Sequence, residues 1–544
     1  MREKLKIESN WIDKAVSYVA PVSGARRLHA RMNLAIAGAW NGASKSRRGM
    51  KGRTPTSGDA NDENNPDLDA LRTNSRDLIR NTPLATGAVN TVCTNVVGPG
   101  LKLFPQIDFD FLNMTEDQAA EWERKTKREF NCWADSKFSD TRRTLAFSDM
   151  QELAFRSALE GGDVFCNMPM LTRARWPYRL TLQLIEADRV SNPDYKQDTE
   201  RLSAGVEKNA RGAPVAYHVS SFHPGNVRPP PGQSRKWSRV PVFATGGRRN
   251  IIHLFKTLRP GQARGVPYLA PVIEPLRQLG RYTDAELMAA VVSGMFTVFI
   301  TTPEGDATVN PMQPTGETGG KTTDEDYKLG YGAMIGLTPG DKVESANPGR
   351  PNTGFDDFVL AISRQIGVAL ELPFEILVKH FTASYSAARG ALLEAWKFFK
   401  ARRLWLARNF CDPVYEAFME DAVSQGRISA PGFFDDPIIR KAYLRAMWIG
   451  PAKGQIDEKK EIEAAEKRLG NNLTTHEQET FELNGGDFEQ NAQQLGKEQR
   501  LLKEAGITSS AEGEQTPASP PAPPPDPEEP PDNMDKSDSD EETE

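Results

Sequence analysis

Residues Leu370–Arg403 read LELPFEILVKHFTASYSAARGALLEAWKFFKARR, and this stretch is the most informative of the chain. Pro373 interrupts an apolar segment, and a link rich in serine, threonine and tyrosine follows it. A long helix begins after the link, with Ser384 or Ser386 as its expected N-cap. Apolar residues recur on one face of that helix, at Ala391, Leu392, Ala395, Trp396 and Phe399. We expect this face to pack against protein.

Basic side chains crowd the C-terminal half of the same helix. They are Lys397, Lys400, Arg402 and Arg403. Cations near a helix C-terminus complement the helix dipole, so a solvated helix end is one interpretation. The other interpretation is a surface that points basic groups at a polyanion. The stretch contains no set of residues typical of catalysis.

Four further blocks accompany this stretch in the chain. They are RNTPLATGAVNTVCTNVVGPGLKL at Arg80–Leu103, EGGDVF at Glu160–Phe165, APGFFDD at Ala430–Asp436 and WIGPAKGQIDEKKEIEAA at Trp448–Ala465. Together, and in this order, the five blocks resemble the portal proteins of tailed bacteriophages. Their sequences are most similar to those of the lambda-type portal family. The resemblance spans about Asp67–Ala465. The basic start, the segment Thr301–Pro351 and the acidic end carry no matching motif.

Two oppositely charged ends are concealed in a net charge of −6. Residues 1–53 hold twelve Lys/Arg against three Asp/Glu, whereas residues 511–544 hold twelve Asp/Glu against one Lys. We expect residues 1–66 to form a partly disordered basic arm and residues 507–544 a disordered, proline-rich acidic tail. A chain of 544 residues is longer than one hydrophobic core usually accommodates, so two or more packed regions are expected.

Cysteine usage and hydropathy favour a protein made in a cytoplasm. The four cysteines, Cys93, Cys132, Cys166 and Cys411, show no CxxC pairing, which favours reduced, buried thiols. No secretory signal opens the chain. The most apolar run, Leu287–Ile300, is too short to span a bilayer and is typical of a buried helix end that leads into a strand. We therefore expect no membrane partner.

The order of expected elements indicates an α+β protein. Helices and alternating strands mix before residue 260, and two capping boxes are expected, Thr115 with Gln118 and Ser148 with Gln151. Thr82-Pro83 is expected to separate two helices at a sharp corner. Helical patterns before Gly294 and after Phe355 flank an irregular module. Three polar helices follow near the end, the second opened by Thr474 with Glu477.

Enzyme chemistry is disfavoured by the motifs. Gly319-Gly320-Lys321-Thr322 ends like a phosphate loop, but Thr315 stands where its first glycine should be. None of the six histidines forms an HExxH or equivalent metal spacing. We expect no catalytic residues, metal or cofactor. The alternatives are a packaging ATPase or nuclease subunit, or another head–tail adaptor ring, whose subunits are usually much smaller.

The resemblance implies a portal fold that assembles into a closed ring, in the family usually of twelve subunits, around a central DNA channel. An α+β wing is expected at 67–259, a first stem helix at 260–294, a clip at 295–354 and a second stem helix at 355–371. A tunnel loop is expected at 372–386, a helix returning to the wing at 387–449 and a helical crown at 450–506.

The same resemblance implies the partners and the surface that meets them. The ring would sit at one vertex of the virion capsid, after assembly in the host cytoplasm. It would hold double-stranded DNA without sequence specificity, and contact the terminase large subunit, capsid or scaffold proteins and head–tail connector proteins. The residues expected at the channel are Lys379, His380, Ser384, Lys397, Lys400, Arg402 and Arg403. Leu392, Trp396 and Phe399 are expected to pack the tunnel helix.

Overall fold

A computed structural model describes residues 57–227, 234–294, 298–301, 342–345, 354–381, 384–452, 458–486 and 488–504, with residues 16, 18 and 20–23. The chain divides into two compact units, Met1–Pro451 and Ala452–Glu544. Most of the expected basic arm, the interior of the expected clip with Gly319–Thr322, and the acidic tail lie outside the described residues.

A sharp corner joins two helices at the start of the first unit, as the sequence predicts. Helix α4 (Leu68–Asn81) ends at Thr82, whose backbone is extended, and α5 (Pro83–Val96) begins directly after it. Pro83 fits the first position of a helix because its missing N–H would have no partner there. A short helix, α3 (Ala60–Asn64), precedes the pair.

Helix α6 (Glu116–Ala134) begins with the predicted capping box. The Thr115 side chain accepts a hydrogen bond from Gln118 N, and the Gln118 side chain accepts one from Thr115 N. Both exchanges satisfy N–H groups that the first helical turn leaves without partners.

The predicted capping box of Ser148 with Gln151 is wrong. Helix α7 (Phe147–Gly161) has Ala146 as its N-cap and so begins two residues earlier, and the Asp149 carboxylate accepts from Ala146 N instead. Gln151 is fully buried and is bonded to the Leu101 backbone, 2.6 Å from its N–H and 3.1 Å from its carbonyl. Since one amide satisfies both groups of a buried residue, Gln151 joins the core rather than capping a helix.

Small antiparallel sheets complete the first unit. The three-stranded sheet has the order β3-β2-β8, with β2 (Asp163–Asn167) in the centre. Cys166 of β2 lies opposite Leu184 of β3 on one side and Ile252 of β8 on the other. Besides β2, the strands of this sheet and of the two sheets described next are β1 (Lys102–Pro105), β3 (Gln183–Glu186), β4 (Leu202–Ser203), β5 (Val206–Lys208), β6 (Pro214–Ser220), β7 (Trp237–Pro241), β8 (Ile251–Phe255) and β11 (Ala446–Ile449). Strands β4 to β7 form a second sheet, and β1 pairs with β11. The α+β class is confirmed.

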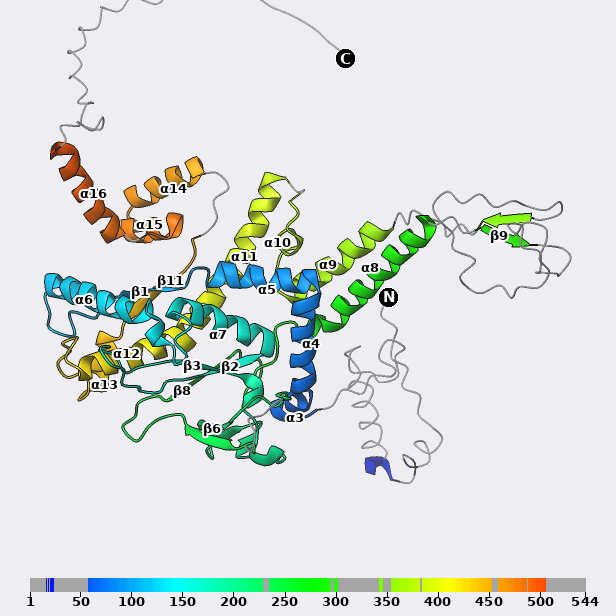
Figure 1. The fold of residues 1–544 in the computed structure, drawn as a ribbon, viewed down its shortest axis with the longest axis horizontal. Coiled ribbons are helices and arrows are strands. Elements are labelled where there is room, and N and C mark those ends of the chain that lie inside the picture. The colour runs from blue at the N-terminus through cyan, green and yellow to red at the C-terminus, as the bar shows by residue number, and fades with distance from the viewer. Residues whose placement is uncertain are drawn as a thin grey trace, which may run out of the picture. The chain divides into compact units, whose positions relative to one another are not determined.

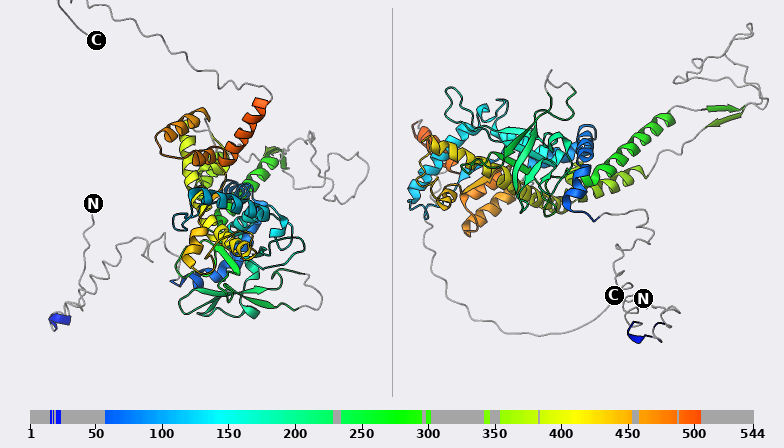
Figure 2. Two further views of the ribbon diagram at one scale, coloured as in Figure 1. Left: turned by 90° about the vertical axis from the view of Figure 1, so that its left-hand side faces the viewer. Right: turned by 90° about the horizontal axis from the view of Figure 1, so that it is seen from below.

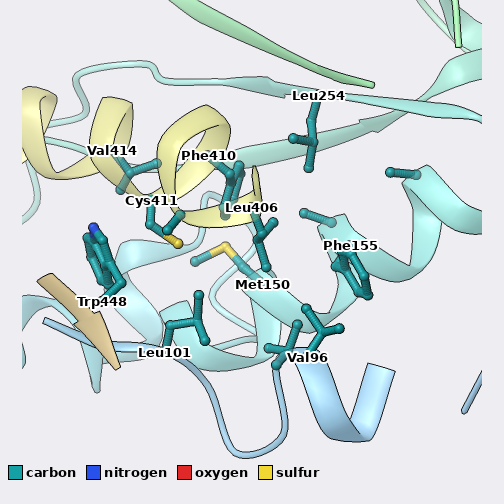
Figure 3. Close-up of a cluster of buried hydrophobic side chains, with 14 of the residues drawn as sticks. Val96, Leu101, Met150, Phe155, Leu254, Leu406, Phe410, Cys411, Val414 and Trp448 are labelled. Carbon is teal, nitrogen blue, oxygen red and sulfur yellow. The ribbon is translucent and has the colours of Figure 1, made fainter. Parts of the chain in front are cut away.

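The core is built where α5, α7 and the last helices of the unit meet the central sheet. Figure 3 shows Val96, Met150 and Leu254 converging on Phe410 and Leu406. All five side chains are at most 1 % exposed. Helices α12 (Asp412–Ser424) and α13 (Pro437–Tyr443) complete this part. Because these segments are far apart in sequence, their packing ties residues 83–161 to residues 395–449.

All four cysteines are free, as the sequence predicts, but they are not all buried. Cys93, Cys166 and Cys411 lie in the core, whereas Cys132 is exposed on α6. Burial raises the pKa of the Cys93 and Cys166 thiols to about 12. Both therefore stay protonated near neutral pH and behave as small apolar side chains.

Asp163 is the centre of a buried ionic cluster. Its Oδ2 accepts from Arg264 Nε at 2.6 Å and from Gly265 N at 3.2 Å, and His253 Nε2 lies 3.1 Å away. Its Oδ1 accepts from Arg72 Nη2 at 3.1 Å. The two arginines hold the pKa of Asp163 well below its usual value despite complete burial, which alone would raise it. The cluster joins α4, β2 and β8.

The free energy of unfolding is expected to fall as the pH drops below about 6.5, which is the usual pKa of histidine. Burial lowers the pKa of His253, so the unfolded state binds this proton more readily and acid favours unfolding. Below about pH 4 the low pKa of Asp163 has the same sign, since its carboxylate stabilises the fold only while charged. Urea midpoints at pH 7, 6 and 5 should decline less for His253→Asn than for the exposed control His380→Gln. Equal declines would contradict the assignment.

Two long helices leave the sheets side by side (Figure 1). Helix α8 (Ile273–Gly294) and helix α9 (Phe355–Ala369) contact each other, and Tyr282 stacks 5.6 Å from the ring of Phe355. The first helix begins at Ile273, so residues 260–272, expected at the start of the stem, lie instead in turns and a short 3-10 helix. Beyond α8, β9 (Val298–Thr301) pairs with β10 (Lys342–Ser345), Thr301 lying opposite Lys342.

The second unit contains three helices among its described residues. They are α14 (Glu458–Gly470), α15 (His476–Asn484) and α16 (Phe488–Glu504), close to the three expected from the sequence. The cap of α15 is Thr475 rather than Thr474, since the Thr475 hydroxyl accepts from Gln478 N at 3.2 Å. Arg468 and Glu479 link the first two helices through two hydrogen bonds of 2.7 Å.

Candidate nucleic-acid interface

A short helix and a left-handed residue set the direction of the predicted tunnel loop. Pro373 precedes α10 (Phe374–Val378), and Lys379 ends it with φ 56°. The turn is held by His380 N, which donates to the Glu375 carbonyl at 3.1 Å. Ile376 and Leu377 are buried beneath it. Lys379 and His380 are both exposed, so the loop presents two basic side chains to solvent.

Ser384 begins the long helix that follows, which settles the choice between two expected N-caps. Helix α11 spans Tyr385–Leu406, and the Ser384 carbonyl accepts from Ala388 N at 2.9 Å. The Ser384 side chain forms no capping hydrogen bond and is exposed. Its hydroxyl is therefore accessible beside the loop. Residues 382 and 383 lie outside the described part of the chain.

One face of α11 packs against the core, in agreement with the predicted apolar stripe. Ala395 and Phe399 are 1 % and 3 % exposed, and Leu392 and Trp396 are partly buried against the same cluster. Phe398, which the sequence pattern did not single out, is also buried. The apolar face is thus wider than expected.

Arg403 belongs to the fold and not to a solvent-facing surface. Its guanidinium donates to the carbonyls of Val96 at 3.1 Å, Asn95 at 2.9 Å and Pro451 at 2.9 Å. It also lies 5.1 Å from the ring of Trp396. Burial lowers the pKa of Arg403 to about 10. A cation at the C-terminus of α5 satisfies carbonyls that the last turn leaves without partners. The prediction that Arg403 faces the channel is therefore wrong, because its guanidinium is buried and bonded within the subunit.

Arg402 is also largely engaged within the subunit. Its guanidinium carbon lies 5.0 Å from the ring of Phe398 and 5.7 Å from that of Tyr268, and its Nη2 is 3.5 Å from Glu371 Oε1. Lys256 approaches the same carboxylate at 3.8 Å. Burial lowers the pKa of Arg402, while Glu371 opposes that shift. The predicted contact of Arg402 with DNA therefore competes with a formed ion pair.

Two of the four predicted cations of α11 remain on the surface. Lys400 is exposed, and Lys397 pairs with Glu394 at 2.8 Å in an exposed contact. With Lys379 and His380 they make a modest set of accessible basic groups. Such groups can attract phosphates without reading base sequence, and the attraction weakens as salt rises. The structure therefore separates Arg402 and Arg403 from the other candidates.

Sequence reasoning missed the joint that fixes the base of the loop. Glu371, with φ 56°, turns the chain between α9 and α10 and receives Arg402. Tyr268 donates its hydroxyl to the Leu370 carbonyl. The sequence did indicate a break in the helix here, because Glu371 lies two residues before Pro373 and a helix is expected to end before a proline.

Family comparison extends across most of this architecture. Residues 46–403 match the family described as phage portal protein, lambda family. The chain belongs to this portal family. The match includes strands β1 to β8, the α8–α9 pair, the loop and α11 as far as Arg403, so the family suggested by the five blocks is confirmed.

Curated relatives of this portal family cover nearly the same length. The portal protein of Escherichia phage N15 is 25 % identical over 482 residues, which cover 85 % of this chain and 90 % of the relative. Portal protein B of Escherichia phage lambda is 24 % identical over 455 residues, 80 % of this chain and 84 % of the relative. The portal function predicted from the sequence is confirmed at this level.

Solved structures similar to this portal chain come from gene transfer agent particles. A chain from the neck of a native particle, computed with C12 symmetry, has a TM-score of 0.40 and 12 % identity, and covers 77 % of this chain and 94 % of its own. A chain from the native virion has a TM-score of 0.38 and 13 % identity, with coverages of 77 % and 93 %.

The described part of the chain contains neither a metal-binding cluster nor a membrane-spanning helix. In the described residues, no cluster of three or more His, Cys, Asp or Glu side chains could hold a metal ion. None of the helices that the structure describes is long and apolar enough to cross a membrane.

Proposed function

We propose that this portal protein assembles into a closed ring of identical subunits, twelve in number as the family resemblance implies, around a channel for double-stranded DNA. The ring sits at one capsid vertex of the virion after assembly in the host cytoplasm, and it serves both packaging and ejection. The observation that supports ring assembly is an apolar stripe on α8 that no other described part of the subunit covers.

That stripe lies on the side of α8 away from α9. Leu287, Met288 and Val291 are exposed, Leu287 by 63 %, although they lie at helical spacing on one face. At 100° per residue they point roughly opposite Tyr282, which faces Phe355 and Phe358 of α9. The right view of Figure 2 shows the two helices side by side from a second direction. Uncovered apolar surface of this kind marks an interface, and a neighbouring stem pair would cover it.

A ring made this way repeats one heterologous contact until it closes. DNA in its channel would meet few cations per subunit, with Lys379, His380, Lys397 and Lys400 as candidates, and Ser384 beside them. Phosphate contacts add affinity with each cation engaged, so a conduit that lets DNA slide needs few of them. The energy for movement would come from a separate motor, the terminase large subunit.

The partner surfaces follow the domain division expected from the sequence. The clip at 295–354 is proposed to dock the terminase and later the head–tail connector proteins, and the wing at 67–259 to face capsid or scaffold proteins. The stem helices, the tunnel loop at 372–386 and the crown at 450–506 complete the proposed division. Non-enzymatic action is part of the proposal, in keeping with the structural role of the portal family.

Placing charge on the α8 stripe is expected to abolish rings while the subunit stays folded. Leu287→Asp with Val291→Asp puts two carboxylates into the proposed interface, where unpaired buried charge is strongly unfavourable. Sedimentation velocity and negative-stain images would report assembly, and circular dichroism the fold. The control is Leu258→Asp, which is 62 % exposed and lies outside the stripe. Rings of normal yield from the double variant would contradict the proposed contact.

A further inference from the structure

A cavity of about 420 Å³ lies in the first unit, away from the loop and from α11's exposed face. Strands β5, β6 and β8 contribute to it, and the segment that joins α11 to α12 closes one side. Its lining includes Lys208, Tyr217, Arg249, Phe255 and Arg408. The volume lies within the range of known ligand sites.

Three cations border this cavity, and no carboxylate belongs to its described lining. Lys208, Arg249 and Arg408 form no ion pair with any other described residue, and no aspartate or glutamate occurs among the described residues of the lining. Arg249 lies 4.8 Å from the exposed ring of Phe243, and Arg408 is exposed. Cations that converge on one concave site lower the energy of an anion placed there.

Two carboxylates outside the lining interact electrostatically with these cations without forming an ion pair, Asp59 with Lys208 and Asp412 with Arg408. Arg249 also borders an adjoining smaller cavity that contains Glu416 and Glu420. Both of those carboxylates are bonded to Arg440. Asp163, behind His253, is held by its own two arginines. The three cations of the lining still outnumber the two carboxylates that act on them from outside it, so the larger cavity keeps a positive character.

A π-helical turn places Arg408 at the rim. Residues Ala407–Cys411 form this turn between α11 and α12, and both Arg408 and Asn409 line the cavity. Turns of this kind are rare and occur frequently at functional sites. Phe410 and Cys411 of the same turn are fully buried, which fixes its backbone in the core.

The floor of the cavity combines an apolar surface with one hydroxyl donor. Ile252, Phe255 and Pro413 supply carbon atoms. The side chain of Tyr217 is 3 % exposed, and its hydroxyl has no hydrogen-bond partner in the described part of the chain. Burial raises the pKa of Tyr217 to about 12, so the hydroxyl stays protonated and can donate. A ligand with carboxylates beside apolar carbon matches this lining.

We infer that the cavity is a binding site for an acidic peptide segment whose carboxylates meet Lys208, Arg249 and Arg408 while an apolar side chain rests on the floor. The inference goes beyond the channel function, since none of these residues belongs to the loop or to the α8 stripe. A peptide is favoured over duplex DNA because the cavity admits a few side chains, whereas a duplex reads as a broad phosphate surface.

Binding of a fluorescently labelled peptide, EEFEEF, to the full chain tests the inference. Anisotropy titrations at about 0.05 M and about 0.5 M salt should show binding that weakens with salt. Lys208→Glu with Arg408→Glu should weaken it by at least about tenfold. Tyr217→Phe, which keeps the packing, should weaken it about threefold through loss of one donor. The matched control is Lys102→Glu with Lys441→Glu, two exposed lysines outside the cavity, which should bind like the unaltered protein.

Three results would overturn the inference. The first is equal loss of binding in the matched control, which would mean attraction by overall charge. The second is displacement of the peptide by free glutamate at the same carboxylate concentration, which would assign the cavity to small acids. The third is displacement by a short DNA duplex at equal charge, which would assign the cations to nucleic acid. Ring yield, measured alongside, separates this site from the channel proposal.

Discussion

Replacing Asp163 with alanine is expected to lower the free energy of unfolding by about 3–5 kcal/mol. The carboxylate is completely buried, and its loss leaves Arg72 and Arg264 buried without their shared counter-charge. Arg264 would keep its hydrogen bonds to the Val190, Ala204 and Ala187 carbonyls, so its charge could not easily leave the core. Urea unfolding followed by tryptophan fluorescence would measure the change.

An exposed ion pair provides the control for this experiment. Glu394→Ala removes the partner of Lys397, and both side chains are at least 70 % exposed. Such pairs contribute about 0.2–1 kcal/mol or less, so this variant should unfold nearly as the unaltered protein does. A loss at Asp163 no larger than that at Glu394 would mean that the buried cluster does not stabilise the fold.

Arg403→Ala is expected to destabilise the subunit by about 3 kcal/mol, because hydrogen bonds from a charged donor contribute about 1.5–3 kcal/mol and buried carbonyls would lose their partner. Rings should decline with the folded subunit. Lys400→Ala, three residues earlier and exposed, should leave stability within about 0.5 kcal/mol. Thermal unfolding and sedimentation of both variants give the comparison.

DNA packaging separates the loop from these structural effects. Lys379→Ala should assemble normally and reduce only the yield of packaged DNA, since a channel contact matters when DNA is present. Loss of rings with Lys379→Ala, together with normal assembly of Arg403→Ala, would reverse the assignment of the two sets.

Local signals in the sequence predicted the helices well. Thr82-Pro83 and the Thr115–Gln118 pair act within one helical turn, so their outcome depends little on distant parts of the chain. The Ser148–Gln151 pattern failed for the opposite reason. Gln151 found the backbone of Leu101, fifty positions away, and that contact is set by packing rather than by a local motif.

The candidate site was predictable only as a group of basic residues. Residues three positions apart on a helix point only about 60° apart, so Lys400 and Arg403 could not be distinguished without knowing which face meets α5. The carbonyls of Asn95 and Val96 decide the place of Arg403, and they lie more than three hundred positions earlier. Glu371 and Asp163 were missed likewise, because their partners come from distant segments.

The β9–β10 pairing described above has a consequence for how this chain tolerates change. Thr301 lies opposite Lys342, so the intervening segment starts and finishes at neighbouring points of a two-stranded ladder. Closing a longer or shorter loop between fixed points alters the free energy slowly, by about 0.6 kcal/mol for each doubling of length. We therefore expect that insertions or deletions between Thr301 and Lys342 change the stability of the rest of the first unit little.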